Sequence, residues 1–152
     1  MSDNAANESD VARAGLLRRF GAMFYDLLLV IALLMVITAV LLPLTGGEAI
    51  TFERHGAWEF AYQVLLVATV VGFFGWFWTR RGQTLGMMAW RLKLVRDDGA
   101  KLTWVDTVKR LGAALVSWIP LGLGFFWVWF DSERLAWHDR WTRTRIVLLP
   151  KR

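Results

Sequence analysis

The sequence predicts an all-α membrane protein, a small transmembrane helical bundle with two full spans, a third apolar segment broken by Pro and Gly, and a short cytoplasmic β-hairpin. Apolar residues make up 56% of the 152 residues and the mean hydropathy is +0.39, whereas soluble domains are roughly 45–50% apolar. Most of the ten Trp residues lie near the ends of apolar runs, where amphipathic rings anchor helices at headgroup level. Residues 1–12 are polar and acidic and are expected to be a disordered tail, so that the domain covers residues 13–152.

The first span is expected between Phe20 and Leu44, directly after a cluster of Arg residues. At a rise of about 1.5 Å per residue, this run crosses a hydrocarbon core of roughly 30 Å. A cleaved signal peptide is disfavoured, because the leading segment is long and acidic. The run contains one ionisable residue, Asp26. An ionised carboxylate that faced lipid would cost about 2.5–3.5 kcal/mol at the bilayer centre, so this side chain requires a partner.

The second span is expected at Phe60–Trp78, after an external loop at residues 43–59 that carries more Glu than Arg. Residues 79–110 then contain eight Lys and Arg residues. Basic loops remain in the cytoplasm, so we expect this segment and the N-terminus to lie on the cytoplasmic side of the inner membrane.

The basic segment contains the expected β-hairpin. RLKLV alternates polar and apolar residues, DDGA supplies a turn, and KLTW is expected to return as the second strand. Thr103 and Asp106 have the spacing of a capping box, which predicts that a helix begins near Trp104.

The third apolar segment, Leu111–Phe130, allows two topologies. It is long enough for one span, which would place the C-terminal tail outside. Its middle contains the helix-breaking residues Pro120, Gly122 and Gly124. The tail is rich in Arg, and the positive-inside rule therefore favours a hairpin of two short helical halves that returns the tail to the cytoplasm. Non-helical backbone at such depth requires shelter by protein or water.

Arg19 and Asp26 are seven residues apart, which places them on nearly the same face of a helix. Two turns separate them, about 10 Å by rise per residue, so a third group or water must complete the carboxylate. An intramembrane ionisable residue is by default a hypothesis for a functional site. The alternative, with near-equal weight, is that Asp26 joins one helix to another through a polar contact.

Three motifs extend this pattern along the chain. A GQTLG motif follows the second span and comprises Gly82, Gln83, Thr84, Leu85 and Gly86. A loop or helix start is the favoured interpretation, and binding of lipid phosphate by its amides is a weaker one. A basic segment, a DG turn and a further Arg follow, at Arg96, Asp98, Gly99 and Arg110. The closing segment HDRWTRTRIVLL contains His138, Asp139 and Thr144.

With these motifs the sequence resembles the RDD family of bacterial membrane proteins, named for one Arg and two Asp, from about Leu16 to Leu149. The resemblance implies that Arg19, Asp26 and Asp139 are the characteristic residues and that GQTLG, Arg110, His138 and Thr144 support them. The usual small residues after HD are replaced here by Trp141 and Arg143. The resemblance implies a membrane location. Transport of some ligand is the function commonly suggested for the family.

Other classes of function are disfavoured. The chain has no Cys and two His, which argues against a disulfide framework and a His-based metal cluster. His138 and Asp139 resemble part of a metal phosphohydrolase site, but such sites need several further ligands. We therefore expect no enzyme, no cofactor and no metal. The net charge of +5 is assigned to membrane orientation and anionic lipid rather than to nucleic acid.

Two functions remain. The favoured hypothesis is transport of an ion or small ligand, with Arg19, Asp26 and Asp139 as one polar cluster. Asp26 would accept a proton or cation, Arg19 would set its charge state and Asp139 would lie near the entry. The bundle is small, so transport would require a homo-oligomer. The alternative is a non-transporting scaffold whose basic cytoplasmic face binds a partner protein or anionic lipid headgroups of the bilayer.

Overall fold

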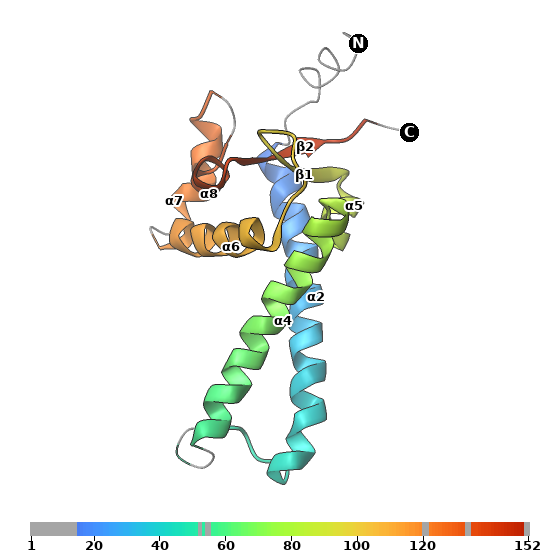
Figure 1. Ribbon diagram of the computed structural model, residues 1–152, viewed down its shortest axis with the longest axis vertical. Helices are drawn as coiled ribbons and strands as arrows, with labels where there is room; N and C mark the ends of the chain where they lie inside the picture. The colour runs from blue at the N-terminus through green and yellow to red at the C-terminus, as the bar shows by residue number, and fades with distance from the viewer. Residues whose placement is uncertain (1–14, 52, 54–55, 120–121, 133–134, 151–152) are drawn as a thin grey trace.

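A computed structural model describes residues 15–51, 53, 56–119, 122–132 and 135–150. Two long antiparallel helices dominate it, α2 (Leu16–Leu41) and α4 (Ala57–Arg81). A short 3-10 turn, η1 (Leu42–Thr45), continues the end of α2 (Figure 1). Both helices are long and apolar enough to cross a membrane. The two predicted spans thus correspond to two helices of suitable length, and the predicted tail lies outside the described residues.

All the other elements gather at one end of the long helices and form a compact head (Figure 1). The head also includes the first turns of α2 and the last turns of α4. Its further elements are α5 (Leu85–Ala89), β1 (Leu92–Arg96), α6 (Trp104–Trp118), α7 (Leu123–Phe126), η2 (Trp127–Trp129), α8 (Trp137–Thr142) and β2 (Thr144–Leu148). Helix α6 lies crosswise to the long helices (Figure 1).

The predicted β-hairpin is wrong in its second strand. β1 pairs antiparallel with β2 from the C-terminal tail, with Leu94 opposite Ile146. The KLTW segment instead leads into α6, because Thr103 caps that helix. The Thr103 side chain accepts a hydrogen bond from the Asp106 amide at 3.2 Å, and the Asp106 carboxylate accepts one from the Thr103 amide at 2.9 Å. The predicted capping box is confirmed.

The predicted break in the third apolar segment is confirmed. α6 ends at Trp118, and the short α7 begins at Leu123, directly after Gly122, whose φ of +79° is readily adopted by glycine. Of the other two predicted breakers, Pro120 lies outside the described residues, and Gly124 lies within α7 and does not break it. With 15 residues, α6 is shorter than the roughly 20 residues that a span needs. The described part of this segment therefore contains no helix long enough for a single span, and the side to which the tail returns stays a prediction.

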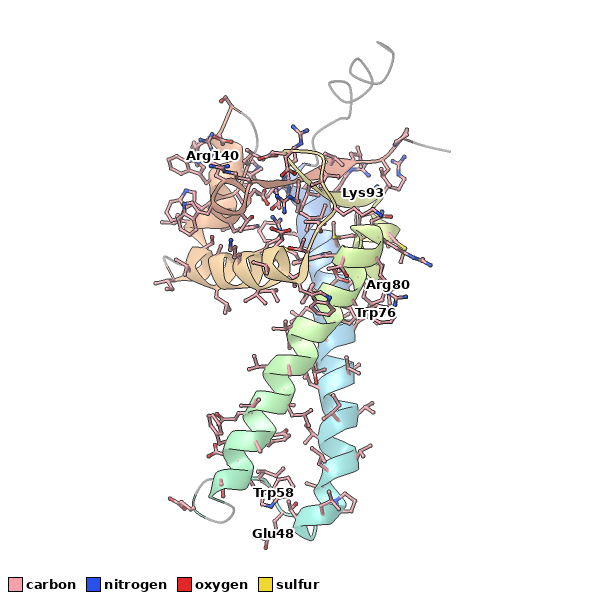
Figure 2. The ribbon with its side chains drawn as sticks, in the orientation of Figure 1. Glu48, Trp58, Trp76, Arg80, Lys93 and Arg140 are labelled. Carbon is pink, nitrogen blue, oxygen red and sulfur yellow. The ribbon has the colours of Figure 1, made fainter. Side chains whose placement is uncertain are left out.

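Packing is concentrated in the head. The buried residues of α2 recur every three or four positions, and none lies beyond Val30: Leu16, Arg19, Ala22, Asp26 and Val30. This spacing is one face of a helix. The buried residues of α4 are Gly75 and Trp78, near its end. Beyond these positions both helices expose apolar side chains (Figure 2).

Candidate functional site

The Asp139 carboxylate is fully buried at the start of α8, with an exposed fraction of 0%. Its Oδ2 accepts a hydrogen bond from the Ala136 amide at 3.1 Å. This bond satisfies one of the free amides at the start of α8. The helix start therefore fixes the carboxylate within the head.

Two arginines from distant parts of the chain share this carboxylate. Arg19 of α2 donates from Nη1 to Oδ2 at 2.5 Å, and Arg110 of α6 donates from Nη2 to Oδ1 at 2.6 Å. Arg110 also donates to the Thr144 hydroxyl at the start of β2. The group of Arg19, Arg110, His138, Asp139 and Thr144, called here the Asp139 cluster, joins α2, α6, α8 and β2.

Burial and charge act against each other in this cluster. Burial would raise the pKa of Asp139, but Arg110 and Arg19 hold it below its usual range. Burial lowers the pKa of Arg110, and Asp139 opposes that shift. Burial and the Arg110 charge lower the pKa of His138 to about 3. The His138 ring, whose Nε2 lies 3.6 Å from Asp139 Oδ1, is therefore neutral at physiological pH.

Asp26 binds the GQTLG motif. One carboxylate oxygen accepts a hydrogen bond from the Thr84 hydroxyl at 2.5 Å, and the other accepts one from the Gly86 amide at 2.9 Å. Thr84 also caps α5 by accepting a bond from the Met87 amide. The partner that Asp26 requires is thus the start of α5, and the interpretation of GQTLG as a helix start is confirmed.

Glycine is required at position 86 because α5 approaches α2 closely. A Cβ there would lie 2.8 Å from Asp26 Oδ1 and would overlap the Ala22 carbonyl oxygen. Gly82 ends α4 with a φ of +67°, and its carbonyl accepts a bond from the Leu94 amide at 2.7 Å. Gln83 donates to the Leu92 carbonyl. The motif therefore fixes α4, α5 and β1 relative to one another, with α5 against α2.

The structure divides the three characteristic residues between two contacts. Arg19 and Asp139 form a buried ion pair, whereas the hydrogen bonds given above for Asp26 go to Thr84 and Gly86. Arg19 and Asp26 share the buried face of α2, two turns apart. The sequence hypothesis of one common cluster did not anticipate this division.

Arg110 pairs with Asp139 as directly as Arg19 does, although the sequence predicted only a supporting role for it. Its guanidinium also lies 5.7 Å from the centre of the Trp78 ring. A signal was present in the sequence. Thr107, Arg110 and Ser117 recur at spacings of three and seven, which places three polar side chains on one face of the helix. That face of α6 is buried.

Chemically, the two contacts are ties between elements. A shared, buried carboxylate joins the first span to the head, and the Asp26 carboxylate joins the same span to the segment after the second. No group of three or more His, Cys, Asp or Glu residues that could hold a metal ion is found in the part of the chain that the structure describes.

Comparisons with known proteins agree with the motifs. The model of the RDD family matches residues 13–143. Uncharacterized protein RP437 of Rickettsia prowazekii (strain Madrid E) is 31% identical over 90 residues, which cover 57% of this chain and 50% of the relative. The chain thus spans about half the length of that relative. No solved structure gives a significant match.

Proposed function

The chain belongs to the RDD family, and on that premise we propose that this membrane protein is a non-transporting scaffold. Its head lies on the cytoplasmic side of the bacterial inner membrane and presents a basic face to anionic lipid headgroups or to a partner protein. The observation that carries the proposal is that the buried charges form contacts between elements of the protein. Asp139 binds Arg19 and Arg110, and Asp26 binds the start of α5. These charges hold the head to the long helices.

Basic side chains on the outside of the head supply the binding face. Six of them are exposed among the described residues: Arg80, Arg81, Lys101, Lys109, Arg140 and Arg143. Figure 2 shows Arg80, Lys93 and Arg140 distributed around the head. A Lys or Arg near an anionic membrane surface contributes about 1 kcal/mol of attraction. Several such residues together would bind anionic lipid without a shaped pocket.

Retention of phosphatidylglycerol tests the scaffold proposal. The purified protein is titrated with phosphatidylglycerol or phosphatidylcholine in detergent, and bound lipids are counted by native mass spectrometry. We expect the triple variant Arg81→Gln, Lys101→Gln, Lys109→Gln to lose phosphatidylglycerol selectively. Asp26→Asn is the matched control and should retain it. Equal retention by the triple variant and the unaltered protein would contradict lipid binding, and a pull-down from membranes with the same variants would then test the partner protein.

Transport is the second candidate, and one observation favours it. Asp26 is a buried ionisable group in a helix that is apolar enough to span the membrane. Two spans enclose no pathway, so transport would require a homo-oligomer in which copies of α2 and α4 surround one. If Asp26 accepts a proton or cation, Asp26→Asn should abolish flux in proteoliposomes while membrane insertion and abundance stay intact. A loss of abundance alone would support the structural role.

The side of the C-terminal tail is tested with a single cysteine at the exposed Ser132. The chain has no Cys, so a membrane-impermeant maleimide reports on that site alone. The ion pair between Arg19 and Asp139 supports a tail on the same side as the N-terminus. We therefore expect labelling only after the membrane is opened. Labelling of intact cells would place the head outside and contradict the proposed orientation.

A further inference from the structure

Helix α6 buries three polar residues and exposes a row of apolar residues. Thr107, Arg110 and Ser117 are buried against the head. Exposed apolar positions at spacings of three, seven and four residues form one stripe, called here the outer face of α6: Val105, Val108, Leu115 and Ile119. Leu115 and Ile119 are 71% and 78% exposed. Such a stripe is unfavourable in water, so an apolar medium or partner is needed to cover it.

The N-terminal end of α6 lies at a defined level of α4. The Trp104 ring is so close to Gly75 that a Cβ on this glycine would lie 2.8 Å from the ring atom Cη2. The next residue, Trp76, has the Arg80 guanidinium 3.6 Å from its ring centre (Figure 2). An aromatic ring beside a basic side chain at the end of an apolar helix is typical of the membrane interface.

The length of the apolar part of α4 supports this boundary. Trp58 lies at the other end of the helix, near Glu48 (Figure 2). From Trp58 to Trp76 the chain advances 18 positions, about 27 Å at a rise of about 1.5 Å per residue. The hydrocarbon core is roughly 30 Å thick. The two Trp residues therefore mark its two surfaces.

Helix α2 gives the same boundary independently. The Thr38 and Tyr62 hydroxyls hydrogen-bond at 2.7 Å, so these two positions lie at one level. Because the helices are antiparallel, thirteen residues along each from that bond lead to Tyr25 and Gly75. The stretch from Leu27 to Gly47 contains no ionisable residue. Asp26 thus lies where the charge-free stretch begins, at the level of Phe74 and within one turn of Trp76.

We propose that α6 is an interfacial helix, which lies in the plane of the cytoplasmic membrane surface with its outer face in the boundary between headgroups and acyl chains. Its direction fits, because it lies across the two spans (Figure 1). Its charge fits, because Lys109, Arg80 and Arg81 are exposed near this level and complement anionic headgroups. Four exposed apolar side chains follow α6 along the chain: Leu123, Trp127, Trp129 and Phe130.

The proposal deepens the proposed function, on which it rests only for the cytoplasmic side of the head. It identifies the outer face of α6 as the surface through which the head contacts the bilayer. It also explains how a carboxylate is tolerated in α2. Asp26 lies at the membrane boundary, beneath α5, rather than at the bilayer centre. The Asp139 cluster then belongs to the head, outside the hydrocarbon core.

Spin labels on single cysteines test the depth of α6. Labels are placed at Val108 and Leu115 in vesicles of phosphatidylcholine and phosphatidylglycerol, and collision rates with oxygen and with a water-soluble nickel chelate are measured by power saturation. All positions used are exposed, so the fold should tolerate them. Val64 in α4 is the control within the bilayer, and Asp98 in the turn after β1 is the control in water. We expect Val108 and Leu115 to favour oxygen over nickel, at a depth between the two controls.

Three results would overturn the proposal. Nickel collision as frequent as at Asp98 would place the outer face in water. Shielding from both reagents would mean that protein, a second copy or a partner, covers the face. A depth equal to that of Val64 would place α6 in the bilayer core. Labels at interfacial depth, combined with equal retention of phosphatidylglycerol by the triple variant and the unaltered protein, would remove the proposed function and leave the interfacial helix intact.

Discussion

The head and the far halves of the two long helices are built on different principles. The head buries apolar side chains against α5 and the sheet, with Ala22, Trp78, Met87, Leu92 and Leu94 at its centre. It also buries the charges of the Asp139 cluster. In the far halves, by contrast, apolar side chains are exposed along both helices. Among the described residues, the Thr38–Tyr62 hydrogen bond joins the two helices in this region.

The difference indicates which surroundings stabilise each region. The head is held by protein contacts, and the far halves require lipid to cover their apolar side chains. The charged residues of the family motif lie on the head side of this division. They are therefore better understood as the attachment of a head to its spans than as a path across the bilayer. Variants in the two regions should differ in their effect on the free energy of unfolding.

The largest effect is expected from Asp139→Asn. The change leaves the buried Arg19 and Arg110 facing a neutral amide, and loss of one partner of a buried ion pair costs about 3–5 kcal/mol. The free energy of unfolding in detergent, followed by Trp fluorescence, measures this loss. The control is Asp98→Asn, which removes an exposed ion pair with Arg96 and should have a much smaller effect. Equal stability of the two variants would mean that the head does not depend on its buried charges.

The second expected effect concerns the close approach of α5 to α2. Gly86→Ala places a methyl group against the Ala22 carbonyl and the Asp26 carboxylate. Because backbone cannot move aside cheaply, the loss should approach about 3 kcal/mol, the upper part of the usual range for overpacking. Gly72→Ala in the far half is the matched control, since nothing lies within 4 Å of its Cβ position. If Gly86→Ala were as stable as Gly72→Ala, the Asp26 contact would not be a rigid tie.

The spans and the start of α6 could be predicted because their signals are local. A run without charges and the capping box at Thr103 act within one segment. The pairing of β1 with β2 could not be predicted, because the DDGA turn offered a nearby second strand and nothing in β1 marks a partner about fifty residues away. Because the capping box at Thr103 starts α6, the segment after the turn leads into that helix and does not form the second strand.

The residues of the candidate site were predicted from the sequence, but their division between two separate contacts was not. The seven-residue spacing places Arg19 and Asp26 on one face of α2, but it does not identify the elements that meet that face. α5 meets it at Asp26, and α8 meets it at Arg19 through Asp139. Such choices depend on how distant segments pack, and one sequence does not contain that information locally. The polar face of α6 indicated Arg110 as a candidate. That this face is the buried one is seen only in the structure, where the opposite face is exposed.

A pH dependence of stability is the third expected effect, and it should arise in the head. The pKa of His138 is about 3 in the folded state and about 6.5 when unfolded. Below pH 6.5 the unfolded chain therefore binds a proton that the folded chain does not. Stability is unaffected by this group above pH 7 and decreases as the pH falls. The decrease should reach about 2 kcal/mol at pH 5.

Unfolding measured from pH 7.5 to 5 in the unaltered protein and in His138→Gln tests this expectation. The glutamine variant lacks the titrating group and should lose the dependence over this interval. A similar decrease in both proteins would assign it to another group. Because the far halves bury no comparable group among the described residues, helix insertion should not change over the same interval.

The smallest effect is expected from Tyr62→Phe in the far half. The change removes the Tyr62 hydroxyl from its bond with Thr38 and keeps the ring. Hydrogen bonds between helices in membranes contribute about 0.6 kcal/mol on average, so the loss of unfolding free energy in lipid should be near that value. Tyr25→Phe, at an exposed ring in the same pair of helices, is the control. A loss as large as that of Gly86→Ala would show that protein contacts hold the far half as they hold the head. A loss near 0.6 kcal/mol would leave lipid as its main source of stability.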